Sequence, residues 1–124
     1  MKQLILALDV PVSANARLIR ARGSRRLISS ARYRAWHESA VDKIKERVRV
    51  CLSGPMRNAV AVTMHVHYPD RRRRDIDNSV KGFFDACTDA GVWLDDSQVT
   101  ILTIVKCEPI KGGLLTANIE EIDE

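Results

Sequence analysis

Strict alternation of apolar and polar residues predicts two strands in the chain. Residues 3–10 alternate, and Pro11 ends the pattern because proline has no backbone N–H to donate. Residues 59–68 alternate in the same way, and His65 and His67 lie on the face opposite the apolar one. Two histidines at this spacing can ligate a metal, but they more often occupy a partly exposed strand face.

Apolar residues at helical spacing predict two helices. The first follows an N-cap at Ser29 or Ser30 and ends before Gly54-Pro55; its apolar stripe is Tyr33, Trp36, Ala40, Val41, Ile44, Val48 and Cys51. The second follows Asp75-Ile76-Asp77-Asn78 and is capped at Gly91; its stripe is Val80, Phe83, Phe84, Cys87 and Ala90. We expect Trp36 and Trp93 to be core aromatics.

The remaining segments complete the predicted fold. Residues 99–107 are apolar on both sides, which is typical of a central strand. Lys111-Gly112-Gly113 predicts a hairpin-like turn before a last strand at 114–122, and residues 13–30 form an arginine-rich loop or arm. The order β-loop-α-β-α-β-β predicts an α+β (mixed α/β) fold: a single domain over residues 1–124 with two main helices against one mixed sheet.

Charge is distributed unevenly along the chain, whose net charge is +4. Between Val10 and His37 there are seven arginines and no acidic residue, whereas five acidic residues and one lysine follow Cys107. This asymmetry predicts that the N-terminal third meets an anionic partner, and a phosphate backbone is the commonest one.

Cysteine usage and hydropathy indicate an intracellular protein. Cys51, Cys87 and Cys107 lie far apart without C-x-x-C spacing, which predicts reduced, buried thiols. No segment has the roughly 20 apolar residues of a membrane span, and the apolar N-terminal run alternates as a strand does. We therefore expect a cytoplasmic protein that does not act at a membrane.

Four residues around the second helix suggest hydrolytic chemistry. Asp75 and Asp77 are one residue apart, so an extended backbone would aim both carboxylates the same way. Their hard oxygen ligands suit Mg²⁺ or Mn²⁺, and Asp96, or its neighbour Asp95, would supply a third carboxylate. Lys81 lies one helical turn after Asp77 and can hold a phosphate at the same place.

Each of these features also has an ordinary structural explanation. An Asp at a helix start is usually a cap, and D-x-D alone is a weak metal motif. The four arginines of residues 71–74 could form a solvated ion-pair network, and Lys81 could be an exposed helix lysine. The convergence of these residues on one place favours the chemical interpretation.

The sequence around these residues resembles the RusA family of Holliday junction resolvases. The resemblance rests on Pro69 to Asn78, Lys81, Phe84-Asp85-Ala86, Ala90-Gly91, Trp93 to Asp96 and Gln98-Val99. It implies a homodimeric, Mg²⁺- or Mn²⁺-dependent endonuclease without a small-molecule cofactor, which resolves four-way DNA junctions by paired symmetric nicks. It also implies that Asp75, Asp77 and Asp96 are the acidic triad and Lys81 the essential lysine; Asp95 lies outside that triad.

The arm and the arginine turn are the expected DNA contacts, made by Asn15, Arg17, Arg20, Arg22, Arg25, Arg26, Arg71, Arg72, Arg73 and Arg74. Residues 16–20 depart from the polar and aromatic run of the best-known family members, so contacts or cutting preference there are expected to differ.

Two other functions remain open from the sequence alone. One is a nuclease for forks or flaps, and the other is a non-catalytic module that binds branched DNA. A binding module has no use for three carboxylates beside a phosphate-contacting surface, where they would repel the ligand without a cation between. The enzyme is therefore the favoured hypothesis.

Overall fold

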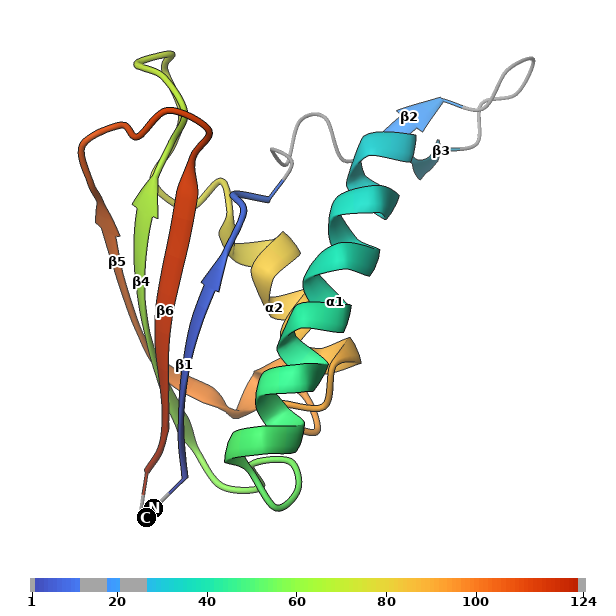
Figure 1. Ribbon diagram of the computed structural model, residues 1–124, viewed down its shortest axis with the longest axis vertical. Helices are drawn as coiled ribbons and strands as arrows, with labels where there is room; N and C mark the ends of the chain where they lie inside the picture. Colours follow the sequence, from blue (N-terminus) through green and yellow to red (C-terminus); the bar gives the residue numbers. More distant parts are fainter. Residues whose placement is uncertain (1, 12–17, 21–26, 123–124) are drawn as a thin grey trace.

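Two helices and a four-stranded sheet form the body of the protein (Figure 1). The computed structural model describes residues 2–11, 18–20 and 27–122. This arrangement confirms the predicted α+β class. The elements in chain order are β1 (Gln3–Leu8), β2 (Leu18–Arg20), β3 (Leu27–Ser29), α1 (Ala31–Cys51), β4 (Val60–His67), α2 (Val80–Asp89), the 3₁₀ helix η2 (Asp96–Gln98), β5 (Val99–Lys106) and β6 (Leu114–Glu121).

The main sheet has the strand order β1-β6-β4-β5 and is mixed. Strand β6 is antiparallel to both β1 and β4, whereas β4 and β5 are parallel. Parallel neighbours need a crossover connection, and α2 supplies it here. The turn at residues 111–113 joins β5 to β6, which are not neighbours because β4 lies between them. It is a turn, as predicted, but the two strands do not form a hairpin.

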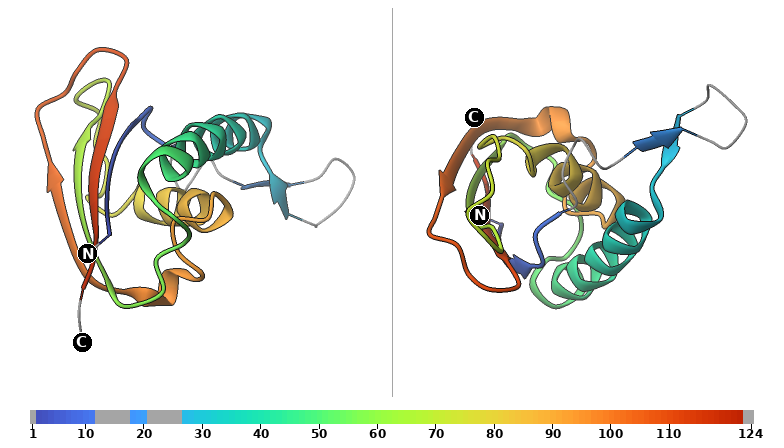
Figure 2. Two further views of the ribbon diagram at one scale, coloured as in Figure 1. Left: turned by 60° about the horizontal axis from the view of Figure 1, so that its bottom comes forward. Right: turned by 90° about the horizontal axis from the view of Figure 1, so that it is seen from above.

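The core lies between the sheet and the helices, which cover one face of the sheet, while no helix of the described residues covers the other (Figure 2). The predicted alternation is confirmed in β1 and β4, whose apolar residues point alternately into the core. Trp93 is buried as expected, and its indole N–H donates to the Thr88 hydroxyl at 2.7 Å. Trp36 is only partly buried, and it donates to the Asp9 carbonyl at 3.1 Å.

Strand β5 is an edge strand, and the prediction of a central strand at residues 99–107 is wrong. It stands last in the strand order, and most of its residues are exposed. Leu102 is 39% exposed although it neighbours the buried Val62 across the β4–β5 ladder. Val99 and Ile104 pack against the core, but Ile101, Leu102 and Val105 do not, so this apolar strand is left partly in solvent.

The start of α1 resolves the choice between two N-caps. The Ser30 hydroxyl accepts the Tyr33 backbone N–H at 3.1 Å, so Ser30 is the cap.

The three thiols differ in burial. The helix α1 ends at Cys51, which is exposed, and Cys107 is only partly buried, so the expectation of buried thiols holds for Cys87 alone. Val48 and the C-cap Leu52 pack against the core at this end of α1, and Cys51 lies off that face, in solvent. None of the helices in the described ranges is long and apolar enough to cross a membrane.

Ser30→Ala is expected to lower the free energy of unfolding by about 1 kcal/mol, because it leaves one N-terminal N–H of α1 without its partner. Urea unfolding followed by circular dichroism measures the change. Ser29→Ala, one residue earlier, is the matched control and should leave the midpoint nearly unchanged. Equal losses from both substitutions would contradict the cap assignment.

Candidate functional site

The acidic motif before α2 lies on a turn. The Asn78 N–H donates to the Asp75 carbonyl and the Val80 N–H to the Asp77 carbonyl, each at 3.1 Å. The extended backbone expected at this motif is therefore wrong: residues 76–79 turn, and the helix starts at Val80. Both aspartates are exposed to solvent.

A buried hydroxyl pair fixes this turn to the end of β4. Ser79 lies in the core, and its hydroxyl is 3.0 Å from the Tyr68 hydroxyl. Ser79 makes no side-chain cap to α2, because its hydroxyl is engaged with Tyr68. The acidic turn is thus held by a polar contact in the core, while its carboxylates face water.

Lys81 is held between two carboxylates. Its ammonium is 2.9 Å from Asp85 Oδ1 and 4.0 Å from Asp96 Oδ2, and its side chain is 62% exposed. The structure therefore brings together two of the predicted site residues, Lys81 and Asp96. Sequence reasoning missed the part played by Asp85, although the i, i+4 spacing from Lys81 is a signal that could have found it.

The turn that carries Asp96 is built by a reciprocal cap. The Asp95 carboxylate accepts the Ser97 N–H at 3.0 Å, and the Gln98 side-chain oxygen accepts the N–H groups of Leu94 and Asp95. The hydrogen bonds from Ser97, followed by the charge of Lys81, lower the pKa of Asp95. Asp95 thus shapes the turn, and its neighbour Asp96 is the carboxylate that faces Lys81.

Lys81 and Asp96 line a cleft between α1, α2 and η2. Its volume is about 520 Å³. Cationic, acidic and hydroxyl side chains line it: Tyr33, Arg34, His37, Lys81, Asp85, Thr88, Asp89, Asp95 and Asp96. A mixed polar lining of this kind suits a charged ligand such as a phosphodiester that approaches with a counterion.

His37, which sequence reasoning left unassigned, joins the two helices across this cleft. Its Nε2 is 2.7 Å from Asp89 Oδ2, and its ring stacks on Tyr33 at 5.7 Å between centroids. The other two histidines lie elsewhere. His65 is exposed on β4, and His67 Nδ1 is 2.8 Å from the Glu108 carbonyl.

The three predicted metal ligands do not form one cluster. Within the residues that the structure describes, no three His, Cys, Asp or Glu side chains are grouped so that they could hold a metal ion. The reason is the crossover: Asp75 and Asp77 precede α2 and Asp96 follows it, and a ten-residue helix is about 15 Å long. The carboxylate chemistry fits Mg²⁺ or Mn²⁺, but Asp96 and the Asp75–Asp77 turn are separate donor groups.

The arginine turn divides into structural and exposed members. Arg74 is 18% exposed, pairs with Asp70 Oδ1 at 2.8 Å and lies 4.8 Å from the centre of the Tyr68 ring. Its hydrogen bond, followed by the Arg72 N–H, lowers the pKa of Asp70. Arg71 pairs with Glu108 at 3.1 Å, and both side chains are largely exposed, as is Arg73. The ion pairs expected at this turn are therefore present for Arg71, Arg72 and Arg74, while DNA contact by the exposed arginines stays a prediction.

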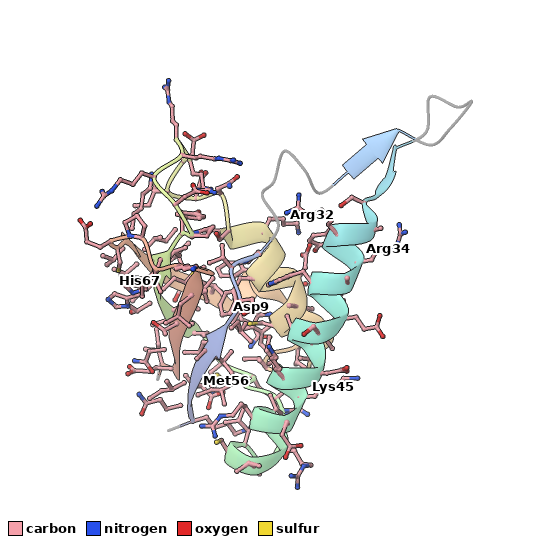
Figure 3. The ribbon with its side chains drawn as sticks, turned by 45° about the horizontal axis from the view of Figure 1, so that its top comes forward. Asp9, Arg32, Arg34, Lys45, Met56 and His67 are labelled. Carbon is pink, nitrogen blue, oxygen red and sulfur yellow. The ribbon has the colours of Figure 1, made fainter. Side chains whose placement is uncertain are left out.

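Of the other predicted DNA contacts, the structure describes only Arg20. Asn15, Arg17, Arg22, Arg25 and Arg26 lie outside the described residues, and Arg20 lies on β2. Part of the predicted loop is a two-stranded ribbon, since β2 and β3 pair antiparallel. The ribbon adjoins the N-terminal end of α1, where Arg32 and Arg34 are exposed (Figure 3).

Comparison with known proteins identifies the family. The family model described as Endodeoxyribonuclease RusA matches residues 9–115. The chain belongs to the RusA family. Two proteins named crossover junction endodeoxyribonuclease RusA, from Escherichia coli K12 and Enterobacteria phage 82, are each 51% identical to it over 63 residues, which is 51% of this chain and 52% of the relative. A third, from Escherichia coli O139:H28, is 46% identical over 65 residues, or 52% of this chain and 54% of the relative.

The RusA family match therefore covers most of the chain, whereas the chain spans about half the length of the curated relatives it matches. The family resemblance predicted from residues 69–99 is confirmed. In the structure this segment runs from the end of β4 through α2 and η2 to the start of β5, and it contains the acidic turn, Lys81 and Asp96.

The arginine turn yields a paired prediction. Arg73→Ala should leave stability unchanged, weaken binding to all DNA forms and reduce the slope of log K against log salt by about 1, as expected for one lost phosphate contact. Arg74→Ala should cost about 1–2 kcal/mol of stability, since it removes a half-buried ion pair and a cation–π contact. Fluorescence anisotropy and urea unfolding measure the two effects. The reverse assignment of effects would show that Arg74 is the DNA contact.

Proposed function

We propose that this chain is a metal-dependent endonuclease that resolves four-way DNA junctions by paired symmetric nicks. The observation that carries the proposal is the Lys81 ammonium 4.0 Å from the Asp96 carboxylate, in the segment where the RusA family match and the predicted acidic motif coincide. A lysine among carboxylates is an arrangement for holding a phosphodiester against a cation.

Asp75, Asp77 and Asp96 would hold Mg²⁺, or Mn²⁺ in its place. Mg²⁺ commonly takes one or two protein carboxylates and completes its shell with water and phosphate oxygens, so the Asp75–Asp77 turn and Asp96, on either side of α2, would act as separate donor groups. When bound, the ion would activate the attacking water and neutralise charge on the phosphate. Lys81 would contact the scissile phosphate, and Asp85 would keep the lysine ammonium in place.

DNA would meet the protein at this cleft and at two other cationic segments of the chain. Arg34 lines it, Arg71 and Arg73 are exposed on the turn beyond β4, and the ribbon at the start of α1 belongs to the arginine-rich arm. Phosphate contacts from these side chains would fix the position of the junction, with binding that weakens as salt rises. We place this activity in the cytoplasm.

The working unit would be a two-fold symmetric dimer. Resolution needs two nicks in opposing strands of like polarity, and the carboxylates assigned here make one site per chain. Two chains must then act on one junction, and closed two-fold symmetry is the commonest association of identical chains.

Adjacent aspartates provide a direct test of the metal assignment. Asp96→Asn should reduce cleavage of a four-way junction by more than about 100-fold while junction binding stays intact or tightens, because a ligand and a negative charge are lost together. Asp95→Asn is the matched control: asparagine also caps helices, so this variant should retain cutting. Asp75→Asn, Asp77→Asn and Lys81→Ala should follow Asp96→Asn in losing rate rather than affinity.

Substrate panels with and without Mg²⁺ separate the alternatives. Labelled four-way junction, fork, flap and linear duplex are compared in one gel assay. Preferential cutting of forks or flaps would replace the junction assignment, and binding without cutting would identify a non-catalytic module. Full cleavage by the Asp96→Asn variant would show that the proposed metal site is wrong.

Mixed dimers test whether two chains share one junction. Dimers of one wild-type and one Asp75→Asn chain should nick a single strand of a supercoiled cruciform and give open circles, whereas wild-type dimers should give linear product. Agarose gels distinguish the two plasmid forms. Linear product from mixed dimers in one binding event would contradict the paired-site arrangement.

A further inference from the structure

In the described part of the chain, strand β5 pairs on one edge only, with β4, and it presents an apolar surface. It is the last strand in the sheet and runs for eight residues. Three of its hydrophobic side chains are largely in solvent: Ile101 is 54% exposed, Leu102 39% and Val105 41%. Val99 to Val105 contains no charged residue and no proline, so β5 has only its last residue, Lys106, and a register shift at its start to protect the edge from pairing.

Both faces of β5 contribute to this surface. By its register with β4, Ile101 and Val105 lie beside Ala61 and His65 on the face of the sheet that no described helix covers. Leu102 lies on the opposite face, beside Val62, but does not pack against the core. A partner that adds a strand here would cover side chains on both faces and satisfy the backbone groups of the edge.

The other sheet edge is not equivalent. Ile5 on β1 is 59% exposed, but the groove along β1 is bounded by charged side chains of α1: Asp42, Lys43, Glu46 and Arg47. Charged groups beside an edge oppose the approach of a second apolar strand. Both edges therefore carry exposed apolar side chains, but only the β1 edge has charged side chains beside it.

We propose that β5 pairs antiparallel with β5 of a second copy of this chain and forms the dimer interface; this rests on the proposed paired action of two chains. An antiparallel pair of one strand with itself has two-fold symmetry, and it joins the two sheets into one. Charge favours this direction. Lys106 ends β5 and Asp95-Asp96 precede it, so antiparallel pairing sets the basic end of one strand toward the acidic end of the other.

Charge insertion on the two edges tests the interface. Ile101→Lys/Val105→Lys should raise the dimer dissociation constant at least tenfold in sedimentation velocity, because the two strands would bring four ammonium groups together. Ile5→Lys on β1 is the matched control and should sediment as the wild type does. All three changed residues are exposed, so urea unfolding should show folded proteins throughout.

A cysteine scan supplies the second measurement. Thr100, Ile101, Leu102 and Thr103 are replaced singly by Cys in a Cys51→Ser/Cys107→Ser background, which leaves only the buried Cys87. In a symmetric antiparallel pair only the residue on the two-fold axis faces itself, so oxidation should cross-link one or two adjacent positions strongly and the others weakly.

The outcomes separate this interface from the proposed activity. If the Ile101→Lys/Val105→Lys variant dimerises as tightly as the wild type, the β5 interface is wrong. A wild-type protein that sediments as a monomer would also overturn it. If such a protein still cuts junctions in the presence of Mg²⁺, the nuclease assignment stands without it. If the β5 substitutions dissociate the dimer but the wild-type protein cuts no DNA, the interface stands and the nuclease assignment is wrong.

Discussion

The parallel pairing of β4 and β5 is the constraint on which the rest of the structure depends. Parallel neighbours require a crossover, and α2 is the main element of it, followed by η2. The chain therefore turns once before α2, where it carries Asp75 and Asp77, and once after it, where it carries Asp96. Lys81 extends along the helix toward Asp85 and Asp96, which makes it the side chain that connects the two ends of the crossover.

Around this crossover, neighbouring residues of one type divide between structure and exposure. Asp95 caps η2 while Asp96 faces Lys81, and Gln98 ties the same turn to the Met56 and Asn58 carbonyls. Arg74 packs on Tyr68 while Arg73 stays in solvent. In each pair the structural member fixes the backbone, so its neighbour can project outward at little cost in conformational entropy. Each turn thus holds one residue in the structure and presents its neighbour's charge, Asp96 toward Lys81 and Arg73 to solvent.

Much of this architecture could be predicted because it is local. Alternation located β1 and β4, helical spacing located both helices, and Ser30 was one of two possible caps. Strand order is not local, however, and an apolar strand such as β5 has the same pattern whether it lies in the centre of a sheet or at an exposed edge. The turn at residues 76–79 was missed because D-x-D carries no signal that separates an extended backbone from a turn, and Lys81 with Asp96 depends on a contact across 15 residues of chain.

The same strand links the candidate site to the proposed assembly. Asp96 lies three residues before β5, so any partner that pairs with β5 also sets the position of a second Asp96. Two fully overlapping eight-residue strands span about 27 Å, and antiparallel pairing places the two η2 turns at opposite ends of that span. A continuous hydrogen-bonded ladder resists stretching far more than a loop contact does. In the proposed dimer, the length of the strand therefore fixes the distance between the two sites. Two symmetric nicks in one junction would require such a fixed distance.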